Sequence, residues 1–388
     1  MRFLKSGIPI SVSSPSSLDF PQMKSNRFQL AFSPYKLIFK EPAGTSRGVL
    51  KEKRTVFVRL KDSEDPSITG YGEVPVFEGL SRESYDQVID RLKTLSSGYI
   101  SVSEITKGEV SSIRFGLESA MQDIKNGSKS IYFPSCFTAR ESSLTINGLI
   151  WMGDFREMER RLIQKIKAGF RCIKIKIGAI KWREEIDLIK RIRSLCGDEI
   201  QIRVDANGAF SPYDCLRKLD QLAVLGVHSV EQPIKARQLN YMRRICCLSP
   251  VPIALDEELI GISVKDKRSE LLEYVKPAYI ILKPSLCFGF SGTLDWIKRA
   301  TSLKIGWWIT SALESNVGLD AITQFTGRLS PVIPQGLGTG TLFNNNLPSP
   351  LLLKKDRLSY SGKHGIYRQI LETLDWCQFH KSPFNNNQ

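Results

Sequence analysis

The sequence predicts an α/β fold, a parallel β barrel wrapped by helices, which follows a smaller α+β unit. From about residue 143, short apolar stretches typical of strands recur, and a helical stretch with a polar face follows most of them. Strand–helix units that repeat about every 25–30 residues indicate a parallel sheet. Seven or eight such units favour a closed barrel over an open sheet. Before residue 143, strand patterns come first and helical patterns follow, which is typical of an α+β unit.

The α+β unit begins with two alternating, extended stretches, 28–39 and 55–61. We expect them to form a hairpin, with the Gly-rich and charged connector 41–54 as a long mobile loop. The segment GYGEVPVFEGL follows at 70–80, and helical patterns lie near 81–95 and 112–126.

The barrel elements can be read in order along the chain. The strand stretches are 143–150, 172–178, 200–208, 229–234, 252–258, 279–285 and 306–312. Clear helical stretches between them are 155–169, 183–197, 212–226 and 291–303, and the first three end in Gly, as helix C-caps do. We therefore divide the chain into a loose N-terminal extension (1–24), an α+β domain (25–135), the barrel (136–345) and a C-terminal segment that returns to the first domain (346–388).

The chain carries a formal net charge of +15, with many Lys and Arg in its first 60 residues. A nucleic-acid-binding protein would show a basic helix or basic strands interleaved with aromatic residues, and neither pattern is evident. We interpret the charge as a solvated basic surface, with attraction of an anionic small-molecule substrate as the alternative.

The eight cysteines form no CxxC pair and have no His cluster near them. We therefore expect free thiols in a reducing cytoplasm rather than a zinc site or a disulfide framework. Because no apolar run approaches the roughly 20 residues of a membrane span, we expect no membrane association. We also expect no signal peptide. The sequence leaves the oligomeric state open.

Two lysines, Lys174 and Lys176, lie in the strand stretch CIKIKIG. Side chains alternate between the two faces of a strand, so both lysines share a face and the isoleucines occupy the other. Lysines do not fit beneath the helices of a barrel. We therefore expect both to face the lumen near its rim; an edge strand with solvated lysines is the alternative.

The next three strands each end in a carboxylate: Asp205, Glu231 and Asp256. On a barrel these side chains converge, and three like charges in one place require a cation. Oxygen ligands alone suit Mg²⁺ or Mn²⁺ better than zinc. Asn207 shares the face of Asp205 and could bind substrate or brace a ligand.

The following strand ends in Lys283, which lies across an eight-stranded barrel from Lys176. A metal flanked by two lysines suits the removal of a proton next to a carboxylate. The metal would stabilise the enediolate that forms, and a lysine would act as the base.

Together these residues resemble the enolase superfamily, whose architecture is a (β/α)7β barrel, similar to a TIM barrel, behind an α+β capping domain. The KxK pair with a later lysine resembles the muconate-lactonizing subgroup. Within it, the segments GYGEVP, RVDANGAF, VEQPI, ALDEELIG and GLGTGTLF resemble the o-succinylbenzoate synthase family of menaquinone biosynthesis.

The resemblance implies a role for each position. Lys176 would be the general base of a syn dehydration, and Lys283 the opposite cation. Asp205, Glu231 and Asp256 would bind Mg²⁺. On the same basis, Lys174, Asn207, Ser311 and Arg47 would contact the substrate, the last from the lid loop of the capping domain.

Two alternatives stay open. An N-acylamino acid racemase or dipeptide epimerase could use the same scaffold with both lysines as acid and base. Dipeptide epimerases typically place an Asp-x-Asp in the last strand, but here that region reads ITSALES, with Glu314 later than expected. A non-catalytic barrel is the other alternative, and it should have lost a lysine or a metal ligand; none is lost here.

Overall fold

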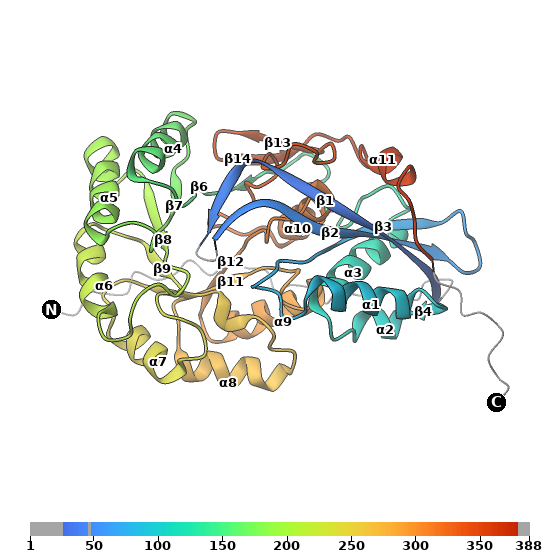
Figure 1. Cartoon of the computed structure of the whole chain (residues 1–388), viewed down its shortest axis with the longest axis horizontal. Coiled ribbons are helices and arrows are strands. Elements are labelled where there is room, and N and C mark those ends of the chain that lie inside the picture. Colours follow the sequence, from blue (N-terminus) through green and yellow to red (C-terminus); the bar gives the residue numbers. More distant parts are fainter. Residues whose placement is uncertain (1–25, 46–47, 379–388) are drawn as a thin grey trace.

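The structure, a computed structural model, describes residues 26–45 and 48–378. An antiparallel sheet with its helices lies beside a barrel of parallel strands (Figure 1). The N-terminal extension expected at 1–24 lies outside the described residues.

The first sheet is antiparallel, with strand order β3-β2-β1-β4. Its strands are β1 (Arg27–Thr45), β2 (Gly48–Asp62), β3 (Thr69–Pro75) and β4 (Tyr99–Ser101). Three helices, α1 (Tyr85–Leu95), α2 (Val102–Thr106) and α3 (Ser111–Lys125), pack on it through a buried apolar cluster. This arrangement buries alternate strand residues such as Phe28, Leu30 and Phe32.

The glycines of the GYGEVP segment allow α3 to lie very close to β3. A Cβ atom at Gly72 would stand 2.0 Å from the carbonyl oxygen of Gly116 in α3, and one at Gly70 would stand 1.9 Å from that of Ala120. Only residues without a side chain permit this approach of helix to strand.

The prediction of a long mobile loop between the first two strands was wrong for most of its length. β1 continues to Thr45 and β2 begins at Gly48, with Thr45 and Gly48 as register partners. The ladder is irregular between Ile38 and Ala43. Glu41, Lys51, Glu52 and Arg54 of this segment are exposed on a two-stranded ribbon, where charged side chains do not oppose strand pairing because they remain in water. Lys53 of the same segment is buried.

The predicted parallel barrel is confirmed. Its seven-stranded sheet, within the described residues, has the order β12-β11-β10-β9-β8-β7-β6, so each strand pairs with the strands that precede and follow it along the barrel. The strands are β6 (Gly148–Ile150), β7 (Cys172–Lys176), β8 (Gln201–Asp205), β9 (Ser229–Glu231), β10 (Ile253–Leu255), β11 (Tyr279–Leu282) and β12 (Gly306–Ile309).

A very short eighth strand closes the barrel. Gln335 bridges Ile146 and Gly336 bridges Thr310, both in parallel. The amide of Gly336 donates to Ile309 (2.8 Å), and the amide of Asn147 donates to Gln335 (2.9 Å). The wall therefore runs from β12 through Gln335 and Gly336 to the residues just before β6.

Helices alternate with the barrel strands and cover its outside (Figure 1). They are α4 (Phe155–Lys167), α5 (Trp182–Cys196), α6 (Cys215–Val224), α7 (Leu239–Leu248), α8 (Lys265–Val275), α9 (Gly289–Ser302) and α10 (Asn316–Leu329), with a 3₁₀ turn at Glu257–Leu259. This gives the (β/α)7β order.

The C-terminal part of the described chain contacts both the barrel and the first domain. Strand β14 (Arg357–Tyr360) pairs with β5 (Leu144–Thr145) on one edge and with β13 (Leu351–Lys354) on the other. Helix α11 (Arg368–Glu372) then packs against the first sheet, where Leu371 joins a cluster with Phe57 and Tyr71. Cys377 exchanges two backbone hydrogen bonds with Phe32 of β1 (3.1 and 2.8 Å).

Buried carboxylates of the first domain attach it to two barrel helices. Glu118 of α3 accepts the amides of Phe290 (2.7 Å) and Ser291 (3.1 Å) at the start of α9. Glu73 of β3 accepts the amides of Ser315 (2.9 Å) and Gly318 (3.0 Å) at the start of α10. Negative charge at a helix N-terminus is stabilised by free amides and the helix dipole. These contacts fix the first domain over the ends of β11 and β12.

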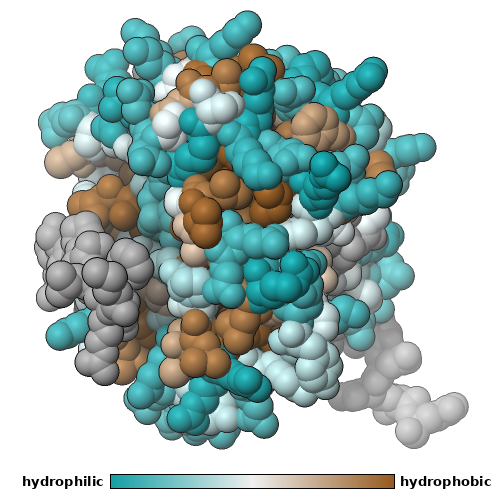
Figure 2. Space-filling view, turned by 90° about the vertical axis from the view of Figure 1, so that its left-hand side faces the viewer, coloured by the Kyte–Doolittle hydropathy of each residue, from teal (hydrophilic) through white to brown (hydrophobic). Residues whose placement is uncertain are grey.

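Among the described residues, no helix is both long and apolar enough to cross a membrane. All eight cysteines are described, and each is a free thiol, as expected. The side of the molecule seen in Figure 2 is largely hydrophilic, with separate apolar patches of limited size.

Candidate active site

The two lysines of β7 face the barrel lumen, as predicted. Lys174 is register partner to Arg203 of β8, and Lys176 to Asp205 at the end of the same strand. The Lys174 ammonium lies 2.9 Å from Asp205 Oδ2 and within 2.8–2.9 Å of both Glu231 carboxylate oxygens. Lys174 is therefore a buried cation held between two carboxylates.

Lys176 lies one step nearer the rim of the barrel. Its ammonium is 3.0 Å from Asp205 Oδ2 and 2.6 Å from Asn207 Oδ1. Asn207 adopts the left-handed conformation (φ +41°), which Asn tolerates better than most residues, and its amide donates to Glu257 (3.0 Å). Asn207 thus connects Lys176 to the end of the β10 segment.

Lys283, directly after β11, binds Asp256 at 2.5 Å. β11 is the fourth strand along from β7, so Lys283 and Lys176 approach the site from opposite walls of the eight-stranded barrel. The three carboxylates of β8, β9 and the end of β10 therefore lie between the lysines of β7 and Lys283.

The charges of this site do not balance among its described residues. Lys174, Lys176 and Lys283 face four carboxylates, those of Asp205, Glu231, Asp256 and Glu257. Burial would raise the pKa of Asp205, but the neighbouring Lys174 and Lys176 lower it strongly. For Glu231, burial and then repulsion from Asp205 raise the pKa. The site is therefore short of positive charge.

Gln232 holds the backbone at Asp256 on the neighbouring strand segment, a role that the sequence did not reveal. This fully buried residue accepts the amides of Asp256 (3.2 Å) and Glu258 (3.3 Å) through its side-chain oxygen. Its nitrogen donates to Ile234 (3.0 Å) and to Glu258 (3.2 Å). The VEQP segment thus carries both Glu231 and the amide that orients Asp256.

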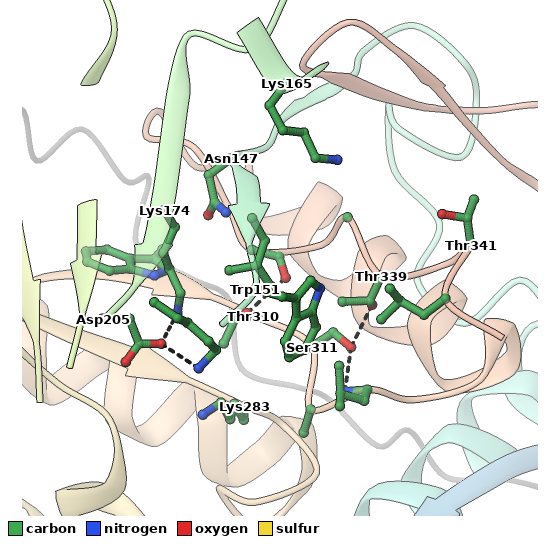
Figure 3. Close-up of a pocket in the computed structure, with 18 of the residues that line it drawn as sticks. Asn147, Trp151, Lys165, Lys174, Asp205, Lys283, Thr310, Ser311, Thr339 and Thr341 are labelled. Carbon is green, nitrogen blue, oxygen red and sulfur yellow. Dashed lines mark hydrogen bonds and ion pairs between the residues drawn. The ribbon is translucent and has the colours of Figure 1, made fainter. Parts of the chain in front are cut away.

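A cavity of about 260 Å³ opens onto these side chains (Figure 3). Six of the predicted site residues line it: Lys174, Lys176, Asp205, Asn207, Lys283 and Ser311. Glu231 and Asp256 are almost fully buried and bind the lysine ammonium groups instead. Arg47 lies outside the described residues.

The carboxylates of Asp205, Glu231 and Asp256 have the chemistry of ligands for a divalent cation, and in this structure each forms an ion pair with a lysine. Within 26–45 and 48–378, no three His, Cys, Asp or Glu side chains already form a group that could hold a metal ion. The reason is visible in the contacts, because Lys174 lies between Asp205 and Glu231, and Lys283 engages Asp256. Hard oxygen donors and an excess of negative charge are what Mg²⁺ prefers.

Ser311, after β12, belongs to a buried hydrogen-bond network centred on Glu314. Glu314 accepts from the hydroxyls of Ser311 (2.6 Å) and Ser285 (2.6 Å) and from the amide of Ala312 (2.7 Å). Thr339 donates to Ser311 (2.9 Å), a contact also drawn in Figure 3. Glu314 is fully buried and occupied, so it is not placed to receive a substrate ammonium group in the cavity.

Several cavity residues were not found from the sequence. Trp151 and Thr339 lie in loops without a strand or helix pattern, and Lys165 lies within a helix whose polar residues resemble an ordinary solvated face. Their position depends on tertiary packing. The one available signal was the segment GLGTGTLF, which contains Thr339 and is among the segments that resemble the family.

Known proteins resemble this chain over most of its length. Residues 157–343 match the model of the family "Enolase C-terminal domain-like". An o-succinylbenzoate synthase from Desulfotalea psychrophila is 42% identical over 368 residues, which cover 86% of this chain and 99% of that protein.

Solved structures agree in fold. The crystal structure of MenC from Desulfotalea psychrophila has a TM-score of 0.76 and 37% identity, covering 86% of this chain and 99% of that one. A dipeptide epimerase from Cytophaga hutchinsonii, solved with Mg and the dipeptide D-Ala-L-Val, has a TM-score of 0.75 but 20% identity, over 90% of this chain and 99% of that one. The second likeness concerns the fold alone.

The Glu314 network predicts a measurable stability difference. In Glu314→Gln, an amide with one acceptor oxygen replaces a carboxylate that receives three hydrogen bonds, and its N–H groups face other donors. We expect the free energy of unfolding, measured in urea, to fall by about 1–3 kcal/mol. Glu270→Gln, at an exposed pair with Lys267, should change it by less than about 0.5 kcal/mol. Equal changes in the two variants would contradict the role of Glu314.

Proposed function

The chain belongs to the enolase superfamily, and from this membership and the charges at its barrel mouth we propose that it catalyses the o-succinylbenzoate synthase reaction. The reaction removes water from 2-succinyl-6-hydroxy-2,4-cyclohexadiene-1-carboxylate. The observation that carries the proposal is the 42% identity to an o-succinylbenzoate synthase over nearly its whole length. The enzyme would be a carbon–oxygen lyase of menaquinone biosynthesis.

In this proposal Lys176 is the general base. Its neutral amine takes the proton from the ring carbon that carries the carboxylate, which gives an enediolate and a lysine ammonium. The same ammonium then returns the proton to the hydroxyl group that leaves the adjacent carbon. The products are water and the aromatic o-succinylbenzoate. The support is the position of Lys176 at the cavity, 2.6 Å from Asn207.

Lys283 would stay positively charged and stabilise the enediolate from the opposite wall. Its contact with Asp256 favours this state, because burial would lower the pKa of Lys283 but Asp256 and Glu257 raise it. Asp205, Glu231 and Asp256 would hold Mg²⁺ or Mn²⁺, which supplies an electrophile for the substrate carboxylate. Lys174, Asn207, Ser311 and Arg47 are proposed substrate contacts.

The surroundings of the site form part of the same proposal. We assign residues 25–135 to the capping domain, 136–345 to the barrel and 346–388 to the C-terminal segment. The substrate is a small anion, and the free thiols support a location in the cytoplasm.

The alternative is an epimerase or racemase on the same scaffold. Its support is weaker, because the dipeptide epimerase from Cytophaga hutchinsonii shares 20% identity with this chain. Glu314, the acidic residue nearest in sequence to the Asp-x-Asp position of dipeptide epimerases, is also buried and so does not face a substrate ammonium group.

The first test concerns the base. Lys176→Ala should lower kcat for the dehydration by about 10²–10⁴-fold or more, because the proton acceptor is lost. Lys176→Arg should lower kcat as well, since arginine keeps the positive charge but does not release a proton to act as a base. Stabilisation by Mg²⁺, followed as the melting temperature, should remain in both variants. Lys190→Ala, on the exposed face of α5, is the control. Activity retained in Lys176→Ala would rule out this base.

The second test concerns the metal. Removing divalent ions with a chelator should stop turnover, and added Mg²⁺ should restore it. Mg²⁺ should also raise the melting temperature, because a ligand that binds the folded state at 100 times its Kd stabilises it by about 2.7 kcal/mol. The shift should disappear in Asp205→Asn and Glu231→Gln but persist in Asp214→Asn, an exposed carboxylate on the barrel surface. Full activity in the presence of the chelator would contradict the proposal that these carboxylates bind a metal ion.

A further inference from the structure

The cavity continues sideways from the lysines through an opening in the barrel wall. β6 pairs with β7 on one edge, with Leu149 opposite Lys174. On its other edge the described contacts to Gln335 stop at Asn147, before the strand begins. The opening is this interval without strand pairing, and the cavity passes through it. Leu149 and Trp151 line one side of the cavity there, and Gly338 and Thr339 line the other.

Lys165 of α4 stands at the far side of this opening. Figure 3 shows it on the same side of the cavity as Asn147, across from Ser311 and Lys283. Its stem lies against Gly148 of β6, where a Cβ atom would come within 3.2 Å of Lys165 Cδ. Its ammonium is 4.9 Å from the centre of the Phe170 ring. Gly148 thus allows a helix lysine to reach the opening.

Lys165 differs from every other cation of the cavity wall in the described chain. Lys174, Lys176 and Lys283 each bind carboxylates, and Arg161, one turn earlier on α4, pairs with Glu157 and Glu41. Lys165 has no hydrogen bond or ion pair to any described residue, and burial alone lowers its pKa. A half-buried ammonium without a counter-charge is costly unless an anion reaches it.

The proposed substrate carries a second carboxylate at the end of its succinyl chain. We propose that Lys165 binds this distal carboxylate and so selects substrates with an anionic side chain; the inference rests on the proposed function. The ring would lie at the lysines of β7 and β11, and the methylene groups would pass between Leu149, Trp151 and the Gly338–Thr339 side. Lys165 acts on binding and does not touch the reacting atoms.

A matched pair of ligands tests this directly. The product o-succinylbenzoate carries the distal carboxylate, and 2-butyrylbenzoate has an acyl chain of the same length without it. Calorimetric titration of the chain with Mg²⁺ present should give roughly tenfold tighter binding of o-succinylbenzoate, the effect of one charged hydrogen bond. In Lys165→Met this preference should vanish while the affinity for 2-butyrylbenzoate stays the same. Lys165→Arg should keep the preference.

Lys167→Met is the control, because Lys167 lies on the same helix but is exposed. It should retain the tenfold preference. Since the ratio of two affinities is compared within each protein, a general loss of binding cancels. The proposal is overturned if the wild-type chain shows no preference, or if Lys165→Met keeps it. Turnover of the cyclohexadiene substrate by the same wild-type sample tests the proposed function separately, so either idea can fail without the other.

Discussion

Buried carboxylates at the ends of neighbouring barrel strands impose the central constraint on this molecule. Asp205 and Glu231 are register partners on β8 and β9, and Asp256 follows the next strand, so the parallel sheet forces them together. Like charges at this distance and depth need cations between them. The lysines of β7 and Lys283, the residue after β11, supply these cations, and burial, followed by repulsion from Asp205, raises the pKa of Glu231. A site built in this way suits a divalent ion and an anionic substrate.

The first domain depends on the same kind of interaction. Glu118 and Glu73 bind the amides at the starts of α9 and α10, the helices that follow Lys283 and Ser311 in the chain. Lys53 of the hairpin donates to the carbonyl of Leu313 (2.8 Å), two residues beyond Ser311. The domain is thus attached at the rim of the cavity, which places Phe77 and Leu80 in the cavity wall. Access to the site and the position of Ser311 are both determined by buried charges.

Much of this arrangement could be predicted because it follows from local periodicity. The alternation in CIKIKIG gave the face of the two lysines, and the strand ends gave the carboxylates and Lys283. The hairpin was predicted, but the extension of β1 and β2 into residues 41–54 was missed, because this segment is polar and lacks the apolar alternation by which strands are recognised. The direct lysine–carboxylate contacts, the bracing by Gln232 and the enclosure of Glu314 depend on distances between elements. Such distances leave no trace in the spacing of residues along the chain. Lys165 is the clearest example, since it reaches the cavity only because Gly148 leaves room for its side chain and the barrel wall is open beside it.

The most direct test of the central claim is a parallel assay of one purified, Mg²⁺-loaded sample with two substrates. Loss of the diene absorbance of 2-succinyl-6-hydroxy-2,4-cyclohexadiene-1-carboxylate would be followed together with chromatographic detection of o-succinylbenzoate. Racemisation of an N-succinyl amino acid and epimerisation of a dipeptide would be followed by circular dichroism. The account predicts one aromatic product for each diene consumed, at a kcat/KM well above that of either stereochemical inversion. Inversion without dehydration would contradict it.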